Sequence, residues 1–311
     1  MDSVEAGSRH LLDIDTLAEH DLSWLIERSR ALANGAQPQA LERTVVNLFF
    51  EASTRTRVSF ELAARRLQMR VVNVELERSS STKGESLEDT AATLAAMGVD
   101  ALVIRHSETG RIHRLASALA RPLRLLNAGD GNGHHPSQAL LDIATLEAAG
   151  VRLEGARIAI IGDLLHSRVA RSDMAAFLRR GVAELRLAGP SDWLPATLPD
   201  RVHRVASLAE AVRAVDVIVM LRIQHERMDR QAWPDAAGYH AEWGLRTEHL
   251  ALAAPGCRVL HPGPINRGVE ISDQVADGPW SLILEQVRMG VFVRMAILEW
   301  LFGADDAARR G

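Results

Sequence analysis

The sequence predicts an α/β protein made of two doubly wound parallel-sheet domains of similar size. Strand-like apolar runs alternate with segments whose apolar residues recur every three or four positions, the pattern of helices that cover a parallel sheet. The run "DVIVMLR" (216–222) is apolar almost throughout, as strands buried on both faces are. The alternation restarts after residue 155, and 311 residues suffice for two cores.

The first series of elements occupies residues 1–150. Leucine and isoleucine side chains at helical spacings mark residues 11–34, and strand and helix patterns then alternate four times. The predicted strands are 43–50, 70–76, 101–106 and 122–129, and the helices that follow them are 58–67, 86–98, 108–120 and 137–150. Residues 77–86 are polar and rich in serine, which predicts an exposed loop.

The second series occupies residues 151–287, and we expect the segment 147–156 to be the hinge between the two. Its predicted strands are 157–163, 184–190, 216–222 and 257–264, and its helices are 166–181 and 207–215. A long helical pattern, 282–303, ends the chain.

Composition and charge exclude several classes of protein. A net charge of −4 argues against a nucleic-acid partner, and the single cysteine, Cys257, excludes a disulfide framework and a cysteine-based zinc site. The histidines lack metal-ligand spacing, so we expect no metal and no cofactor. No apolar run reaches about 18 residues, which argues against a membrane protein. The N-terminus has no apolar signal-peptide core, and we expect a cytoplasmic protein.

The segment "FFEASTRTRVSF" (49–60) follows a predicted strand and opens a helix with two arginines, Arg55 and Arg57. Cations are unfavourable there, because the N-terminus of a helix is the positive end of its dipole. Ser53 and Thr54 are typical capping residues. Their hydroxyls, the first-turn N–H groups and the arginines together predict a site for an anion, best a phosphate. The alternative is a capped helix whose arginines face solvent.

Two further strand ends in the first half carry polar residues. Arg105 follows an apolar strand, where an arginine is least costly if it has an anionic partner. Pro136 fits the first turn of a helix. His135 and Gln138 are three residues apart, so they lie on one side of that helix and can both face one carbonyl or amide group. The alternatives are a surface arginine and a capping histidine.

The second half repeats the pattern of arginines at strand ends. Arg168 and Arg171 open a helix in "GDLLHSRVARS", where a dinucleotide-binding fold would carry its glycine fingerprint, and this argues against a nicotinamide cofactor. Arg222 and Gln224 lie on one side of the extended segment "RIQHER", an arrangement that suits a dicarboxylate. The alternative for each arginine is an exposed side chain.

Two loops remain. Lys83 lies in the serine-rich loop, which is not a Walker A sequence and is otherwise interpreted as a surface loop. The turn "HPGP" places Gly263 before Pro264, and this bond is a candidate cis peptide.

These motifs resemble the catalytic chains of carbamoyltransferases over nearly the whole length and in the right order. The segments that carry the resemblance are "FFEASTRTRVSFELAARRL", "KGESLEDT", "IRH", "NAGDGNGHHPSQALLD", "GDLLHSRVARS", "LRIQHER" and "HPGPINRGVEI". S-T-R-T-R and H-P-S-Q mark the whole family. The last two segments resemble the aspartate branch, whereas ornithine carbamoyltransferases carry S-M-G and H-C-L-P motifs.

The resemblance implies a reaction, an active site in the cleft between the two domains, and a role for each domain. The carbamoyl group of carbamoyl phosphate would pass to the α-amino group of L-aspartate, giving N-carbamoyl-L-aspartate and phosphate, an early step of de novo pyrimidine biosynthesis. Residues 1–150 would bind carbamoyl phosphate, with the helix 288–303 packing back on them, and residues 151–287 would bind aspartate. The motifs identify no general base, and the departing phosphate is one candidate.

The resemblance also implies a role for each site residue. The phosphate would bind Ser53, Thr54, Arg55, Thr56 and Arg105. The catalytic residues around the carbonyl oxygen would be Arg55, Thr56, Arg105 and His135. The carbamoyl amide would be held by Gln138 and the backbone of Pro262 and Gly263. Aspartate would bind Lys83, Arg168, Arg222 and Gln224. Arg57 either joins the phosphate ligands or braces the loop through Glu51.

Lys83 and a serine of its loop would reach into the site of a neighbouring subunit, which implies a homotrimer with shared active sites. Counting back from Lys83 gives Ser79, although the triple serine 79–81 leaves the choice open. Assembly of the trimer with a regulatory chain or a dihydroorotase also stays open.

Three alternative functions fit the sequence less well. A carbamoyltransferase with ornithine or another amine as acceptor fits poorly, because the second half is rich in arginine. An inactive scaffold subunit of a pyrimidine-pathway complex fits poorly, because every motif residue is present. A dinucleotide-dependent oxidoreductase lacks its glycine fingerprint.

Overall fold

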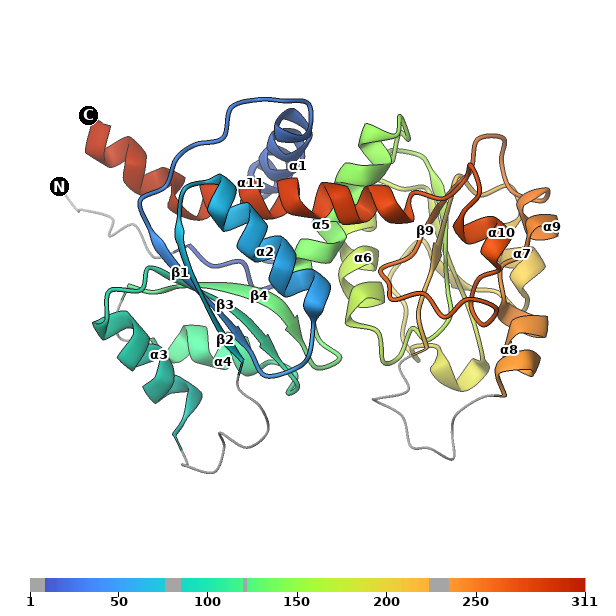
Figure 1. Cartoon of the computed structure of the whole chain (residues 1–311). Helices are drawn as coiled ribbons and strands as arrows, with labels where there is room; N and C mark the ends of the chain where they lie inside the picture. The colour runs from blue at the N-terminus through green and yellow to red at the C-terminus, as the bar shows by residue number, and fades with distance from the viewer. Residues whose placement is uncertain (1–8, 76–84, 120–121, 224–234, 311) are drawn as a thin grey trace. The chain divides into compact units, whose positions relative to one another are not determined.

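A computed structural model describes residues 9–75, 85–119, 122–223 and 235–310. The chain forms two compact units (Figure 1), Met1–Leu140 with Met289–Gly311, and Leu141–Arg288. One division falls inside helix α5 (Pro136–Ala148) and the other inside helix α11 (Ile283–Arg310). Most of the C-terminal helix is thereby part of the first unit.

The first unit contains a four-stranded sheet whose strands match the four predicted ones. They are β1 (Thr44–Phe49), β2 (Arg70–Glu75), β3 (Ala101–His106) and β4 (Arg124–Asp130). Their order is β2-β1-β3-β4, and every pairing is parallel. In Figure 1 helix α2 (Thr54–Arg66) covers one face, and α3 (Leu87–Ala96) and α4 (Arg111–Ala118) cover the other.

The N-terminal segment differs from the prediction. Helix α1 begins only at Glu19 and ends at Ala33; before it, residues 14–17 form a turn, and Leu11 forms a bridge to the edge of the sheet. Leu11 pairs with Leu126 of β4: its N–H donates to Leu125, and its carbonyl oxygen accepts from Asn127. Leucine spacing suited a helix here, but the open edge of β4 offers backbone hydrogen bonds that an extended segment can use.

The second unit contains a five-stranded sheet in the order β7-β6-β5-β8-β9, again parallel throughout. Its strands are β5 (Arg157–Ile161), β6 (Glu184–Ala188), β7 (Val202–Arg204), β8 (Val217–Met220) and β9 (Arg258–Leu260). Its helices include α6 (Arg168–Arg179), α7 (Leu208–Val212), α8 (Ala236–Trp243), α9 (Thr247–Leu250) and α10 (Asp273–Ala276). The two parallel sheets confirm the predicted α/β class.

Each sheet begins at an inner strand and grows in both directions. In the first sheet the chain moves from β1 outward to β2 and then returns to place β3 on the other side of β1. In the second sheet it moves from β5 to β6 and β7, and then places β8 on the other side of β5. Ligands of such sheets bind beyond the carboxyl ends of the two strands at which the direction reverses. The fold therefore predicts ligand sites beyond the ends of β1 and β3 in the first sheet and of β5 and β8 in the second.

No helix in the described ranges is both long and apolar enough to cross a membrane.

Candidate active site

The N-terminus of α2 lies directly beyond the end of β1 and carries no acidic side chain in its first turn. Ser53 is the N-cap, and within the described chain its side chain makes no capping hydrogen bond. The first intrahelical bond joins the N–H of Arg57 to the carbonyl oxygen of Ser53, at 3.1 Å. The N–H groups of Thr54, Arg55 and Thr56 precede that bond, so they face out of the helix end. This end of α2 is suited to an anion.

Arg105 connects this helix end to its neighbours in the sheet. It lies in β3 opposite Phe49, and its carbonyl oxygen accepts a hydrogen bond of 2.9 Å from the N–H of Phe50. Its Nε lies 3.2 Å from Oε2 of Glu51, and its Nη1 donates to the carbonyl oxygen of Ala128 in β4, at 3.3 Å. The guanidinium is thus held between the turn after β1 and the end of β4, at the predicted reversal point.

The turn after β4 is built around Asp130, a buried residue that sequence analysis did not single out. Its Oδ1 accepts the N–H of His134 at 2.6 Å, and its Oδ2 accepts the N–H of Gly110 at 2.9 Å. Its carbonyl oxygen accepts the N–H of Gly133 at 2.7 Å. A Cβ on Gly131, whose φ is +45°, would lie 2.5 Å from Oγ1 of Thr109. The turn therefore has one tightly determined conformation.

His135 and Gln138 follow this turn at the N-terminus of α5, as predicted. Pro136 opens the helix, and the N–H of Gln138 donates to the carbonyl oxygen of His135 at 2.9 Å. Both side chains are buried, at 5% and 8% exposure. The first unit thus places hydroxyl, guanidinium, imidazole and amide groups at the ends of three adjacent strands. Such groups can bind a phosphate together with polar atoms of the group that the phosphate carries.

The second unit places two arginines at its own reversal point. Arg168 is the first residue of α6, after β5, and its side chain is only 3% exposed, whereas Arg222 follows β8 and is half-buried. The two strand ends approach closely at Gly162, whose φ is +127°, since a Cβ there would lie 3.0 Å from the carbonyl oxygen of Leu221. Two guanidinium groups at the carboxyl ends of these strands give this edge of the sheet positive charge, which suits a carboxylate ligand.

The remaining predicted residues are distributed as follows. Pro262 and Gly263 form the turn after β9, and the Gly263–Pro264 bond is cis, which confirms that prediction. Ser79, Lys83 and Gln224 lie outside the described residues. The proposed roles of these residues therefore stay predictions.

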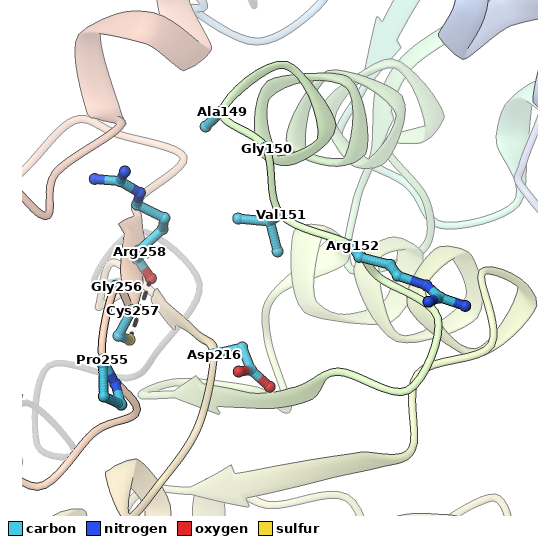
Figure 2. A pocket seen from close by; sticks show the side chains of 9 residues that line it. All are labelled: Ala149, Gly150, Val151, Arg152, Asp216, Pro255, Gly256, Cys257 and Arg258. Atoms are coloured by element: carbon cyan, nitrogen blue, oxygen red, sulfur yellow. Dashed lines mark hydrogen bonds between the residues drawn. The ribbon is translucent and has the colours of Figure 1, made fainter.

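One surface cavity of about 370 Å³ lies at the opposite, amino-terminal edge of the second sheet (Figure 2). It is lined by Asp216 before β8 and by Cys257 before β9. Burial raises the pKa of the Cys257 thiol to about 12, which makes it a poor nucleophile. In Figure 2 the guanidinium groups of Arg152 and Arg258 point away from each other. The cavity therefore lacks the converging polar groups of the strand ends.

Comparison with known proteins shows which family the chain belongs to. A family model described as the carbamoyl-P binding domain of aspartate/ornithine carbamoyltransferase matches residues 9–148, and the Asp/Orn binding domain of the same family matches residues 154–301. The chain belongs to the aspartate/ornithine carbamoyltransferase family. It is accordingly a carbamoyltransferase, as the resemblance implied.

Solved structures of the family share its fold. A Trypanosoma cruzi aspartate transcarbamoylase in complex with carbamoyl aspartate and phosphate is 32% identical, with a TM-score of 0.83 over 95% of this chain and 96% of that one. The same enzyme in complex with N-(phosphonacetyl)-L-aspartic acid is 32% identical, with a TM-score of 0.83 over 96% and 97%. Ornithine carbamoyltransferase from Pyrococcus furiosus has a TM-score of 0.83 over 97% and 99%, but at 23% identity it shows the fold alone.

Proposed function

We propose that this chain is an aspartate carbamoyltransferase. It transfers the carbamoyl group of carbamoyl phosphate to the α-amino group of L-aspartate and releases phosphate, as an early step of cytoplasmic pyrimidine biosynthesis. The observation that carries the choice of acceptor is the pair Arg168 and Arg222 at the reversal point of the second sheet. Two guanidinium groups favour a dicarboxylate and disfavour a cationic acceptor such as ornithine.

In this proposal each unit binds one substrate. The first unit binds carbamoyl phosphate through Ser53, Thr54, Arg55, Thr56, Arg105, His135 and Gln138, and the turn at Pro262 and Gly263 completes the carbamoyl subsite. The second unit binds L-aspartate through Arg168, Arg222 and Gln224, with Lys83. Binding both substrates in the right orientation makes their reaction effectively unimolecular, which lowers the entropic part of the barrier.

The chemistry follows from the positive groups around the carbonyl carbon. The uncharged α-amino group attacks that carbon, and negative charge develops on the carbonyl oxygen. Arg55, Thr56, Arg105 and His135 stabilise this charge as preorganised donors. Phosphate then leaves against the N-terminus of α2 and the arginines, which neutralise its charge.

An acceptor assay tests this proposal. Carbamoyl transfer from carbamoyl phosphate is measured with L-aspartate and with L-ornithine in parallel. We expect product with aspartate only, and we expect Arg222→Ala to raise KM for aspartate at least about tenfold, because it removes a charged hydrogen-bonding partner. Product with ornithine would overturn the roles of Arg168 and Arg222. No product with either acceptor would favour a scaffold subunit.

We also propose that the active unit is a homotrimer in which Ser79 and Lys83 complete the site of a neighbouring subunit. Its support is the place of these residues in the sequence, shortly after the end of β2, which is an edge strand of the first sheet in the described chain. Arg55→Ala and Lys83→Ala proteins, each strongly impaired alone, are expected to regain activity when their subunits are mixed. A monomer in sedimentation, or no recovery on mixing, would contradict shared sites.

A further inference from the structure

The turn after β9 has no backbone N–H group left for a ligand. The N–H of His261 donates to Oε1 of Gln286 at 2.9 Å, and the N–H of Gly263 donates to Nδ1 of His261 at 2.8 Å. Pro262 and Pro264 have no N–H group. What the backbone of this turn can offer a ligand is therefore carbonyl oxygen only, a hydrogen-bond acceptor.

The imidazole of His261 fixes this arrangement. Because its Nδ1 accepts a hydrogen bond from Gly263, the ring proton is on Nε2, which lies 3.0 Å from Oε1 of Glu270. The same oxygen accepts the N–H of Asn266 at 2.6 Å. His261 and Glu270 are both fully buried. The histidine thus ties the start of the loop to its end through a single carboxylate oxygen.

A second set of buried groups fixes the other side of His261. Nε2 of Gln286 donates to Oδ1 of Asp142 at 2.6 Å, so its Oε1 is the atom that faces the N–H of His261. Asp142 lies beside Asp173, and burial, followed by repulsion from Asp142, raises the pKa of Asp173 well above its usual range. The donation to Asp142 and the acceptance from His261 together give the amide of Gln286 one orientation.

We propose that His261, held by Glu270 and Gln286, is a positioning residue that keeps the Pro262–Gly263 turn free of hydrogen-bond donors, so that the turn selects a ligand whose facing group is itself a donor. This inference rests on the proposed function, in which that group is the NH₂ of carbamoyl phosphate. A carbonyl-lined turn favours an amide over a methyl group or a second oxygen, since a methyl group donates nothing and an oxygen meets another acceptor.

Acetyl phosphate is a direct probe, because it replaces the NH₂ by a methyl group of similar size. The quantity to measure is the ratio of its inhibition constant to the KM for carbamoyl phosphate. His261→Gln retains a donor that can reach Glu270 but loses the acceptor for Gly263, and we expect the ratio to fall about tenfold. His261→Asn retains that acceptor, because its side-chain oxygen can take the N–H two residues ahead, and we expect it to preserve the ratio.

A general loss of packing would lower kcat in both variants and leave the ratio unchanged. An unchanged ratio in His261→Gln therefore overturns the proposal. So does an equal fall in both variants, because the retained acceptor would then be irrelevant.

The wild-type protein provides a readout that needs no variant to fold. In deuterated, nitrogen-15-labelled protein we expect a coupling across the hydrogen bond between the Gly263 amide and Nδ1 of His261, with the ring proton on Nε2. A proton on Nδ1 would overturn the proposal whatever the activity. A wild-type protein that shows this coupling and transfers no carbamoyl group would instead contradict the proposed function.

Discussion

Replacing Arg55 with alanine is expected to lower carbamoyl transfer about 10²–10³-fold, the usual effect of losing one preorganised oxyanion donor. The same change should leave stability equal or slightly higher. Arg55 is an exposed side chain in the first turn of α2, where a cation opposes the helix dipole, and alanine is a better helix former. A residue that is unfavourable for its helix but needed for its reaction should show this opposite pair of effects.

Arg65→Ala is the matched control, because Arg65 lies in the last turn of the same helix. There the cation is favourable, and Arg65 pairs with Glu61 at 2.8 Å while 64% exposed. We expect unchanged activity and slightly lower stability, the reverse of Arg55→Ala. Both proteins are compared at the same oligomeric state, with kcat, KM and the thermal midpoint as readouts. Equal activities would remove Arg55 from the site, and a large loss of stability in Arg55→Ala would make its role structural.

The residues at the strand ends could be predicted because two local signals coincide there. An apolar run locates the end of a buried strand, and a cation just after it, at Arg105 or Arg168, contradicts the local preference. The strand 101–106 was predicted with the bounds that β3 has. Where a functional residue breaks a rule of local structure, the sequence alone reveals it.

The supporting residues could not be predicted in the same way. Asp130 looks like an ordinary turn residue, yet its carboxylate accepts the N–H of Gly110, 20 residues away. Strand β7 was missed because its three residues, Val202–Arg204, are mostly polar and exposed at the edge of the sheet. In both cases the deciding partner is distant in sequence, so no pattern within a short window marks it.

The ion pair between Arg28 and Glu299 is the clearest case of such a distant partner, and its loss should give the largest stability effect. Nε and Nη2 of Arg28 in α1 bind the two carboxylate oxygens of Glu299 in α11 at 2.5 and 2.9 Å, across 271 residues of sequence. The N–H of Gln39 donates to the same carboxylate at 2.8 Å. Glu299 is 2% exposed, so these donors take the place of water around its carboxylate.

Arg28→Ala should lower the free energy of unfolding by about 3 kcal/mol. This is the lower end of the cost of leaving one charge of a buried pair without its partner. The lower end applies because the Arg28 side chain is 24% exposed and the N–H of Gln39 still faces the carboxylate. In urea the unfolding midpoint should fall by roughly 1 M or more. Arg152→Ala is the control, because Arg152 and Glu154 form a pair of similar length, 2.6 Å, between two exposed side chains, and no shift is expected.

The double variant Arg28→Met with Glu299→Leu separates attraction from desolvation. If the single variant is unstable because Glu299 keeps a buried charge without its main partner, removing that charge too should restore most of the lost stability. If the double variant is as unstable as Arg28→Ala, the pair itself supplies the stability and the desolvation argument is wrong. Either way, activity per folded molecule should stay unchanged, because neither residue belongs to the strand ends that form the candidate site.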